Sequence, residues 1–145
     1  MTRFSSAQVL AQLKDFQRRT VDHVFHRMYL DGAPTRRFLV ADEVGLGKTM
    51  VAKGVIARTI EHLQDRVERI NTVYVCSNSA IAKQNVSRLK VDGGSEFVLA
   101  SRLTLLPTKV QDLREKRVNF VSFTPGTTFD LKSRAGLMAE RAVLF

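Results

Sequence analysis

One short stretch combines the residue types that hold a chain of phosphates. Residues 42–49 read Asp-Glu-Val-Gly-Leu-Gly-Lys-Thr. Gly45 and Gly47 give the backbone the freedom to curl with its N–H groups facing inward, and Lys48 can reach a β- or γ-phosphate. The hydroxyl of Thr49 is of the type that such loops offer to Mg²⁺. The stretch therefore predicts a phosphate-binding loop whose ligand is Mg·ATP.

The residues on either side of the loop predict the elements that position it. Residues 38–41 form an apolar run typical of a buried strand, which would lead directly into the loop. After the loop, the apolar residues from Lys48 to Leu63 recur at helical spacing, so a helix is expected there, with the positive end of its dipole at the phosphates. Gly54 costs this helix about 1 kcal/mol relative to Ala, which indicates a close backbone approach.

The loop departs from the strict phosphate-loop pattern, G-x-x-x-x-G-K-[ST], at its first glycine, where this chain has Asp42. With this departure, residues 41–49 resemble motif I of the superfamily 2 helicases and translocases, DEAD/DEAH-type ATPases, and in particular their Swi/Snf-like branch. The resemblance implies an ATP site with Lys48 as its catalytic lysine and Thr49 on Mg²⁺. The implied nucleotide-binding residues of the loop are Asp42, Glu43, Val44, Gly45, Leu46, Gly47, Lys48 and Thr49. The alternative is a Gly-Lys-Thr that stands at a helix start by chance.

A further candidate for nucleotide binding is Gln17, in an N-terminal stretch whose apolar residues recur at helical spacing from Ser5 to Leu30. A carboxamide offers a donor and an acceptor together, which match adenine N6 and N7. Residues 15–18 also resemble the adenine-recognition element of the same superfamily. The alternative is a polar residue on a solvated helix face.

Later apolar runs predict a parallel sheet. Residues 72–77 are largely β-branched and typical of a strand covered on both faces, residues 118–123 form a second strand, and residues 97–100 a short one. A helix over residues 80–89, capped at Asn78-Ser79, separates the first two. Alternating strands and helices predict an α/β fold with right-handed crossovers, of the RecA-like P-loop type.

Polar turns after these strands are candidate contacts for a nucleic-acid backbone. Ser77 and Asn78 occupy the place of motif Ia in the resemblance, and Thr124, Gly126 and Thr127 belong to a Thr-Pro-Gly-Thr turn that looks like motif Ib. Hydroxyls and free N–H groups suit a phosphate oxygen. The alternatives are an ordinary capped helix and a Pro-Gly turn without function.

The composition leads to predictions about the binding partner and the cellular compartment. The 145 residues include 23 Lys and Arg against 14 Asp and Glu, and the net charge of +9 favours a polyanionic partner. The alternative is a solvated surface with an excess of basic residues. The resemblance implies that the partner is nucleic acid, DNA in particular. The single cysteine, Cys76, cannot form a disulfide within the chain, which indicates a reducing compartment. No apolar run approaches the roughly 20 residues needed to span a bilayer, so we expect a cytoplasmic chain without a membrane partner.

The same resemblance also implies parts that the sequence does not contain. Phosphoryl transfer in this superfamily needs a Walker B acid on a neighbouring strand to hold Mg²⁺ and a glutamate to orient water. The sole Asp-Glu pair, Asp42-Glu43, belongs to the loop itself. We therefore expect an N-terminal helical segment, 1–34, and a partial RecA-like domain, 35–145, truncated before Walker B, with negligible ATPase activity unless missing C-terminal motor domains or a complementary chain complete it.

Two other classes of function are compatible with a phosphate loop. The first is a non-catalytic module that binds a nucleotide or a nucleic acid. The second is an unrelated P-loop kinase or GTPase, which is disfavoured because the base-reading element Asn-Lys-x-Asp of GTPases does not occur.

Overall fold

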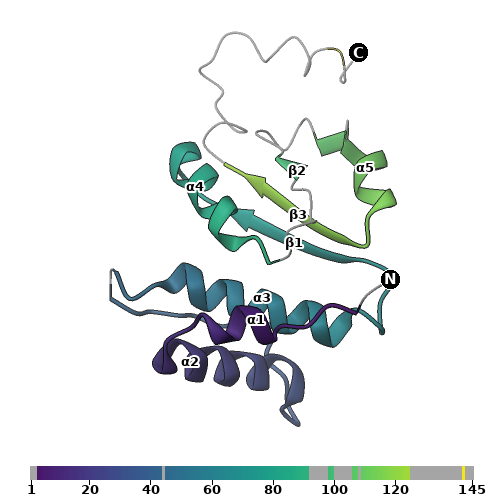
Figure 1. Ribbon diagram of the computed structural model, residues 1–145. Coiled ribbons are helices and arrows are strands. Elements are labelled where there is room, and N and C mark those ends of the chain that lie inside the picture. Colours follow the sequence, from purple (N-terminus) through teal and green to yellow (C-terminus); the bar gives the residue numbers. More distant parts are fainter. Residues whose placement is uncertain are drawn as a thin grey trace. The chain divides into compact units, whose positions relative to one another are not determined.

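The computed structural model describes residues 3–43, 45–91, 98–99, 106–107, 109–124 and 142 (Figure 1). It is a mixed helix and strand structure with a parallel sheet, which confirms the α/β class. The chain packs as two compact units, the first formed by Met1–Glu68 with Arg88–Gly93 and the second by Arg69–Ser87 with Gly94–Phe145. The elements are α1 (Ala7–Ala11), α2 (Asp15–Phe25), the π-helical turn η1 (His26–Leu30), α3 (Lys48–Leu63), β1 (Ile70–Val75), α4 (Ser79–Leu89), β2 (Val98–Leu99), α5 (Val110–Glu115) and β3 (Val118–Phe123).

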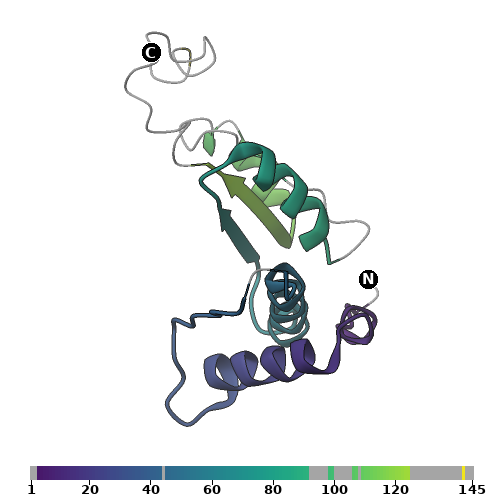
Figure 2. The same cartoon turned by 90° about the vertical axis from the view of Figure 1, so that its left-hand side faces the viewer.

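The first unit is a layer of helices in which α1 and α2 pack on α3 (Figures 1 and 2). Its core is built from Leu13, Val21 and Val51, with Val21 completely buried. The helix predicted from Lys48 to Leu63 has those bounds in the structure, and the helical stretch predicted over residues 5–30 forms α1, α2 and η1.

The close backbone approach expected at Gly54 is confirmed. A Cβ atom at this position would lie 2.7 Å from Cγ2 of Val21 and 3.0 Å from Cδ1 of Leu13. The glycine therefore lets the backbone of α3 approach side chains of the N-terminal helical segment more closely than any other residue would allow.

The prediction of a strand over residues 38–41 is wrong for this structure. The segment alternates as a strand would, because Val40 packs against the core while Leu39 is 84% exposed, and the ring of Phe38 meets that of His23 edge-on at 5.6 Å. It is not a strand because no described residue pairs with its backbone. A strand is defined by its hydrogen-bonded neighbour, and an apolar run alone cannot supply one.

The second unit contains a three-stranded parallel sheet in the order β1-β3-β2. Pairing between β1 and β3 runs from Ile70 opposite Val118 to Val75 opposite Phe123. The strand predicted over residues 118–123 has those bounds, the short strand lies within the predicted range, and the strand predicted at 72–77 begins and ends two residues earlier.

The strand predicted at residues 72–77 corresponds to β1. We expected both of its faces to be buried, and the structure does not show this. Val73 and Val75 are 57% and 52% exposed, and Val73 lines an apolar hollow of about 320 Å³ between α5 and the sheet. By contrast, β3 lies between two neighbouring strands and is largely buried. The two strands also differ in pairing, because among the described residues β1 has a paired neighbour on one edge only.

Asn119 of β3 links the sheet to α5. Its side chain is 1% exposed, and its Nδ2 lies 3.0 Å from Oδ1 of Asn71, 3.0 Å from the carbonyl oxygen of Leu113 and 3.2 Å from that of Lys116. One amide group thus joins β3 to β1 and to the C-terminal end of α5. Within the described ranges, no helix has both the length and the apolar character needed to cross a membrane.

Candidate phosphate-binding site

The loop before α3 has a backbone suited to an anion. Gly45 and Gly47 have φ angles of +91° and +82°. Leu46, between them, has a negative φ, since no described residue other than glycine has a positive one. Alternating signs of φ turn successive N–H groups toward one side, which is the geometry of an anion-binding nest. The 16-residue helix α3 begins directly after Gly47, so its positive end lies at the same place.

Lys48, the first residue of α3, folds back over the loop. Its Nζ donates hydrogen bonds to the carbonyl oxygens of Asp42, at 2.7 Å, and Glu43, at 2.9 Å. An ammonium group has three N–H donors, so one remains for another acceptor. The side chain is exposed, so an incoming phosphate can reach it by competing with two backbone carbonyls.

The structure brings Gln17 to this loop, although the two are 29 residues apart in the sequence. The side chain of Gln17 is 7% exposed, its Oε1 accepts a hydrogen bond from the backbone N–H of Lys14 at 3.0 Å, and its Nε2 donates to the carbonyl oxygen of Leu46 at 3.0 Å. The alternative of a solvated polar residue is therefore wrong. The carboxamide keeps one N–H and one lone pair beyond these two bonds.

The remaining loop residues contribute in different ways. Asp42 and Glu43 contact Lys48 through their backbone carbonyl oxygens and not through their carboxylates. Thr49 is half-buried in the first turn of α3, and Val44 lies outside the described residues. The loop thus presents backbone groups and one ammonium group, the usual partners of a phosphate chain.

Candidate nucleic-acid contacts lie in the second unit. Oδ1 of Asn78 accepts the backbone N–H groups of Ala80, at 2.9 Å, and Ile81, at 3.2 Å, which confirms its predicted capping role. Ser77 is exposed, and Thr124 is buried and has a partner. Gly126 and Thr127 lie outside the described residues. Binding of a nucleic acid by these turns stays a prediction.

Residue types alone did not reveal the bond between Gln17 and Leu46. The acceptor is a backbone carbonyl, which leaves no signature in a sequence. The spacing of Gln17 from Lys14 was a usable signal, because a Gln at the third helical position commonly bonds back to the N–H before the helix.

Comparisons with protein-family models, curated proteins and solved structures find no match for this chain. Glycines with positive φ, a helix N-terminus and a lysine amine lie together in the loop, and a hydroxyl follows in Thr49. These groups suit a ligand that carries phosphates.

Proposed function

We propose that the chain binds Mg·ATP at residues 42–49, as the ATP-binding part of a superfamily 2 motor of the Swi/Snf-like branch. In its full-length form such a motor couples ATP hydrolysis to movement on, or unwinding of, nucleic acid. The observation that carries the proposal is the position of Lys48, whose amine lies over a loop with two positive-φ glycines at the start of α3. The RecA-like identity of the fold is part of this proposal.

The loop residues and Gln17 would each contact a different part of Mg·ATP. Backbone N–H groups around Gly45 and Gly47 would bind phosphate oxygens, and Lys48 would neutralise the β- and γ-phosphates. Thr49 would give its hydroxyl to Mg²⁺, which neutralises the phosphate charge that develops during transfer. Adenine recognition by Gln17 would use the N–H and the lone pair left over from its bonds to Leu46 and Lys14.

The proposed partners are nucleic acid, DNA in particular, and the motor domains or complementary chain that would complete the ATP site. The net charge of +9 supports a polyanionic partner. A reducing, cytoplasmic location belongs to the same proposal and is supported by the single cysteine.

Calorimetric titration of Mg·ATP into the wild type, Lys48→Ala and Lys53→Ala tests the nucleotide site. Lys53 is the matched control, because it lies on α3 five positions further along and its loss removes the same charge without touching the loop. We expect binding by the wild type and by Lys53→Ala and none by Lys48→Ala, with the fold retained in all three. Unchanged affinity in Lys48→Ala would remove the assignment.

A second candidate is a module that binds nucleotide or nucleic acid without hydrolysing ATP. It is favoured by one observation: the sole Asp-Glu pair of the sequence, Asp42-Glu43, belongs to the loop itself, so the sequence offers no second such pair to hold Mg²⁺ and orient the attacking water. Phosphate release at saturating Mg·ATP, measured together with the motor domains or complementary chain that would complete the ATP site, separates the two. Turnover abolished by Lys48→Ala supports the motor, and tight binding without turnover supports the module.

A further inference from the structure

We propose that Gln17 is a positioning residue that holds the phosphate loop in its anion-binding shape. The inference rests on the proposed nucleotide binding and concerns the same site. It differs from adenine recognition because the group on which Gln17 acts is the protein's own backbone.

Gln17 is fixed from both sides of its carboxamide. Oε1 is held by the N–H of Lys14 at the start of α2, and Nε2 holds the carbonyl of Leu46, both at 3.0 Å. With 7% of the residue exposed, the amide is shielded from water that would compete for these bonds. The start of α2 therefore serves as a rigid support for the loop.

The bond to Leu46 sets the direction of a donor in the loop. The carbonyl of Leu46 and the N–H of Gly47 belong to one planar trans peptide unit, in which they point in opposite directions. Because Gln17 pulls the carbonyl toward itself, the N–H of Gly47 points away from this buried side chain. A rotated peptide would present the carbonyl oxygen to a phosphate and repel it.

The space around Gly47 reinforces this arrangement. A Cβ atom at Gly47 would lie 2.5 Å from Nε2 of Gln17, so the amide occupies the place of a side chain there. The φ angle of +82° also belongs to the left-handed region that favours glycine. Gln17 and Gly47 thus form a matched pair that defines the loop just before α3.

The role predicts an effect that does not depend on the base. When the bond to Leu46 is lost, the peptide between Leu46 and Gly47 can rotate, and every ligand that uses the Gly47 N–H loses the same preorganised donor. Affinity for inorganic tripolyphosphate should fall about tenfold, the equivalent of one hydrogen bond, and affinity for ATP should fall by at least as much. The proposed adenine contact of Gln17 would add to the loss for ATP only.

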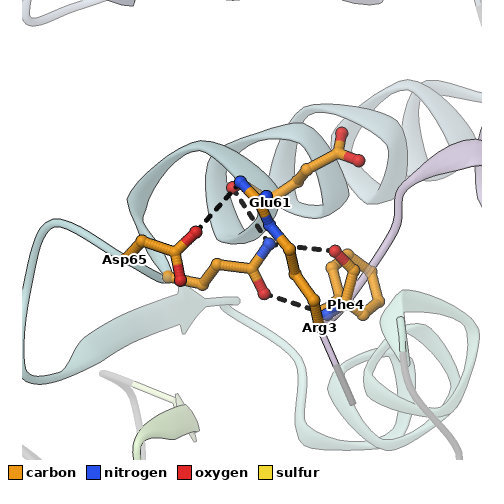
Figure 3. A network of polar contacts seen from close by, with 5 residues as sticks. Arg3, Phe4, Glu61 and Asp65 are labelled. Atoms are coloured by element: carbon orange, nitrogen blue, oxygen red, sulfur yellow. Dashed lines mark hydrogen bonds and ion pairs between the residues drawn. The ribbon is translucent and has the colours of Figure 1, made fainter.

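Gln64 provides a matched control near the other end of α3. Its Oε1 accepts the backbone N–H of Phe4 and its Nε2 donates to the carbonyl of Phe4, both at 2.9 Å. Figure 3 shows Phe4 in this polar network, together with Arg3, Glu61 and Asp65. Like Gln17, Gln64 joins helix and backbone through its carboxamide, but it does so away from the loop.

The experiment measures dissociation constants for Mg·ATP and Mg·tripolyphosphate in the wild type, Gln17→Met, Gln17→Ala and Gln64→Ala. Methionine has the length of glutamine without its hydrogen bonds, so it preserves packing if alanine prevents folding. The NMR signal of the Gly47 amide, which reports the orientation of its peptide unit, is followed in the same proteins. We expect both Gln17 variants to bind tripolyphosphate about tenfold more weakly and ATP at least as much more weakly, with a shifted Gly47 signal, and Gln64→Ala to match the wild type.

Two outcomes would overturn the positioning role and leave the nucleotide site in place. The first is weaker binding of ATP with unchanged binding of tripolyphosphate. The second is unchanged affinity for both ligands and an unchanged Gly47 amide signal in Gln17→Met. A wild type that binds neither ligand would overturn the proposed function and the inference together.

Discussion

Gly54 of α3 lies so close to Val21 of α2 that a single added Cβ atom would come within 2.7 Å of the valine Cγ2. The same atom would lie 3.0 Å from Cδ1 of Leu13. All three residues are buried, so none can move into solvent to make room. Packing of the N-terminal helical segment against α3 therefore depends on this glycine.

Gly54→Ala should destabilise the protein although alanine is the better helix former. Overpacking of a core costs about 1–3 kcal/mol, whereas the helix propensity of alanine returns about 1 kcal/mol. Denaturant unfolding should show a lower midpoint. Gly32→Ala is the control, because nothing lies within 4 Å of its added Cβ, and it should be neutral. A Gly54→Ala variant as stable as the wild type would contradict the close packing.

Two substitutions of Asn119 should destabilise the protein to different extents, because one only removes the amide group and the other also buries a charge. Asn119→Ala removes the donor shared by Asn71, Leu113 and Lys116 and should cost about 1–3 kcal/mol. Asn119→Asp should cost more, because it turns a buried carboxylate toward backbone carbonyl oxygens. Thermal unfolding ranks the two variants. The linking role of Asn119 would be wrong if Asn119→Asp were as stable as the wild type.

His62 should make stability depend on pH. Burial lowers the pKa of His62 from its usual value of 6.5, and the neighbouring positive charge of Arg66 lowers it further. The unfolded chain therefore binds a proton at higher pH than the folded chain, so this contribution to stability is complete above pH 6.5 and is lost as the pH falls toward the lowered pKa. The free energy of unfolding should decline from about pH 7 to pH 5, and His62→Gln should flatten the profile. An identical slope in the variant would exclude His62 as the cause.

Binding to DNA should be weak, indifferent to sequence and steeply dependent on salt, because it would rest on phosphate contacts. Fluorescence anisotropy with two unrelated duplexes, between about 50 and 200 mM salt, gives the slope of affinity against salt. An affinity that salt leaves unchanged would contradict a phosphate-based interface.

Local pattern was enough to predict some elements and not others. The bounds of α3 and β3 were predictable because each combines a periodic or continuous apolar pattern with clear flanking residues. The segment at residues 38–41 has a strand pattern as well, but a strand also requires a neighbour, and sequence does not state which segments lie side by side.

The candidate site was predictable by residue type more than by contact. Lys48 and both loop glycines were identified because their chemistry is distinctive, and the structure places the lysine amine over the loop. Gln17 was identified for its carboxamide, but its acceptor on Leu46 is a backbone atom that any residue would carry. The packing of helices that lie far apart in the sequence decides which peptide unit of the loop Gln17 holds, and from which side.

The segment at residues 38–41, which pairs with no strand among the described residues, should make the chain sensitive to proteases at this place. Arg36 and Arg37 are exposed directly before it, and proteases bind their substrates as extended backbone without neighbours. Trypsin should therefore nick the chain at these arginines. The two fragments should stay together after the cut, because Val21 remains packed on Gly54, and a chain nicked in this way would run as one species on a sizing column and as two bands in denaturant.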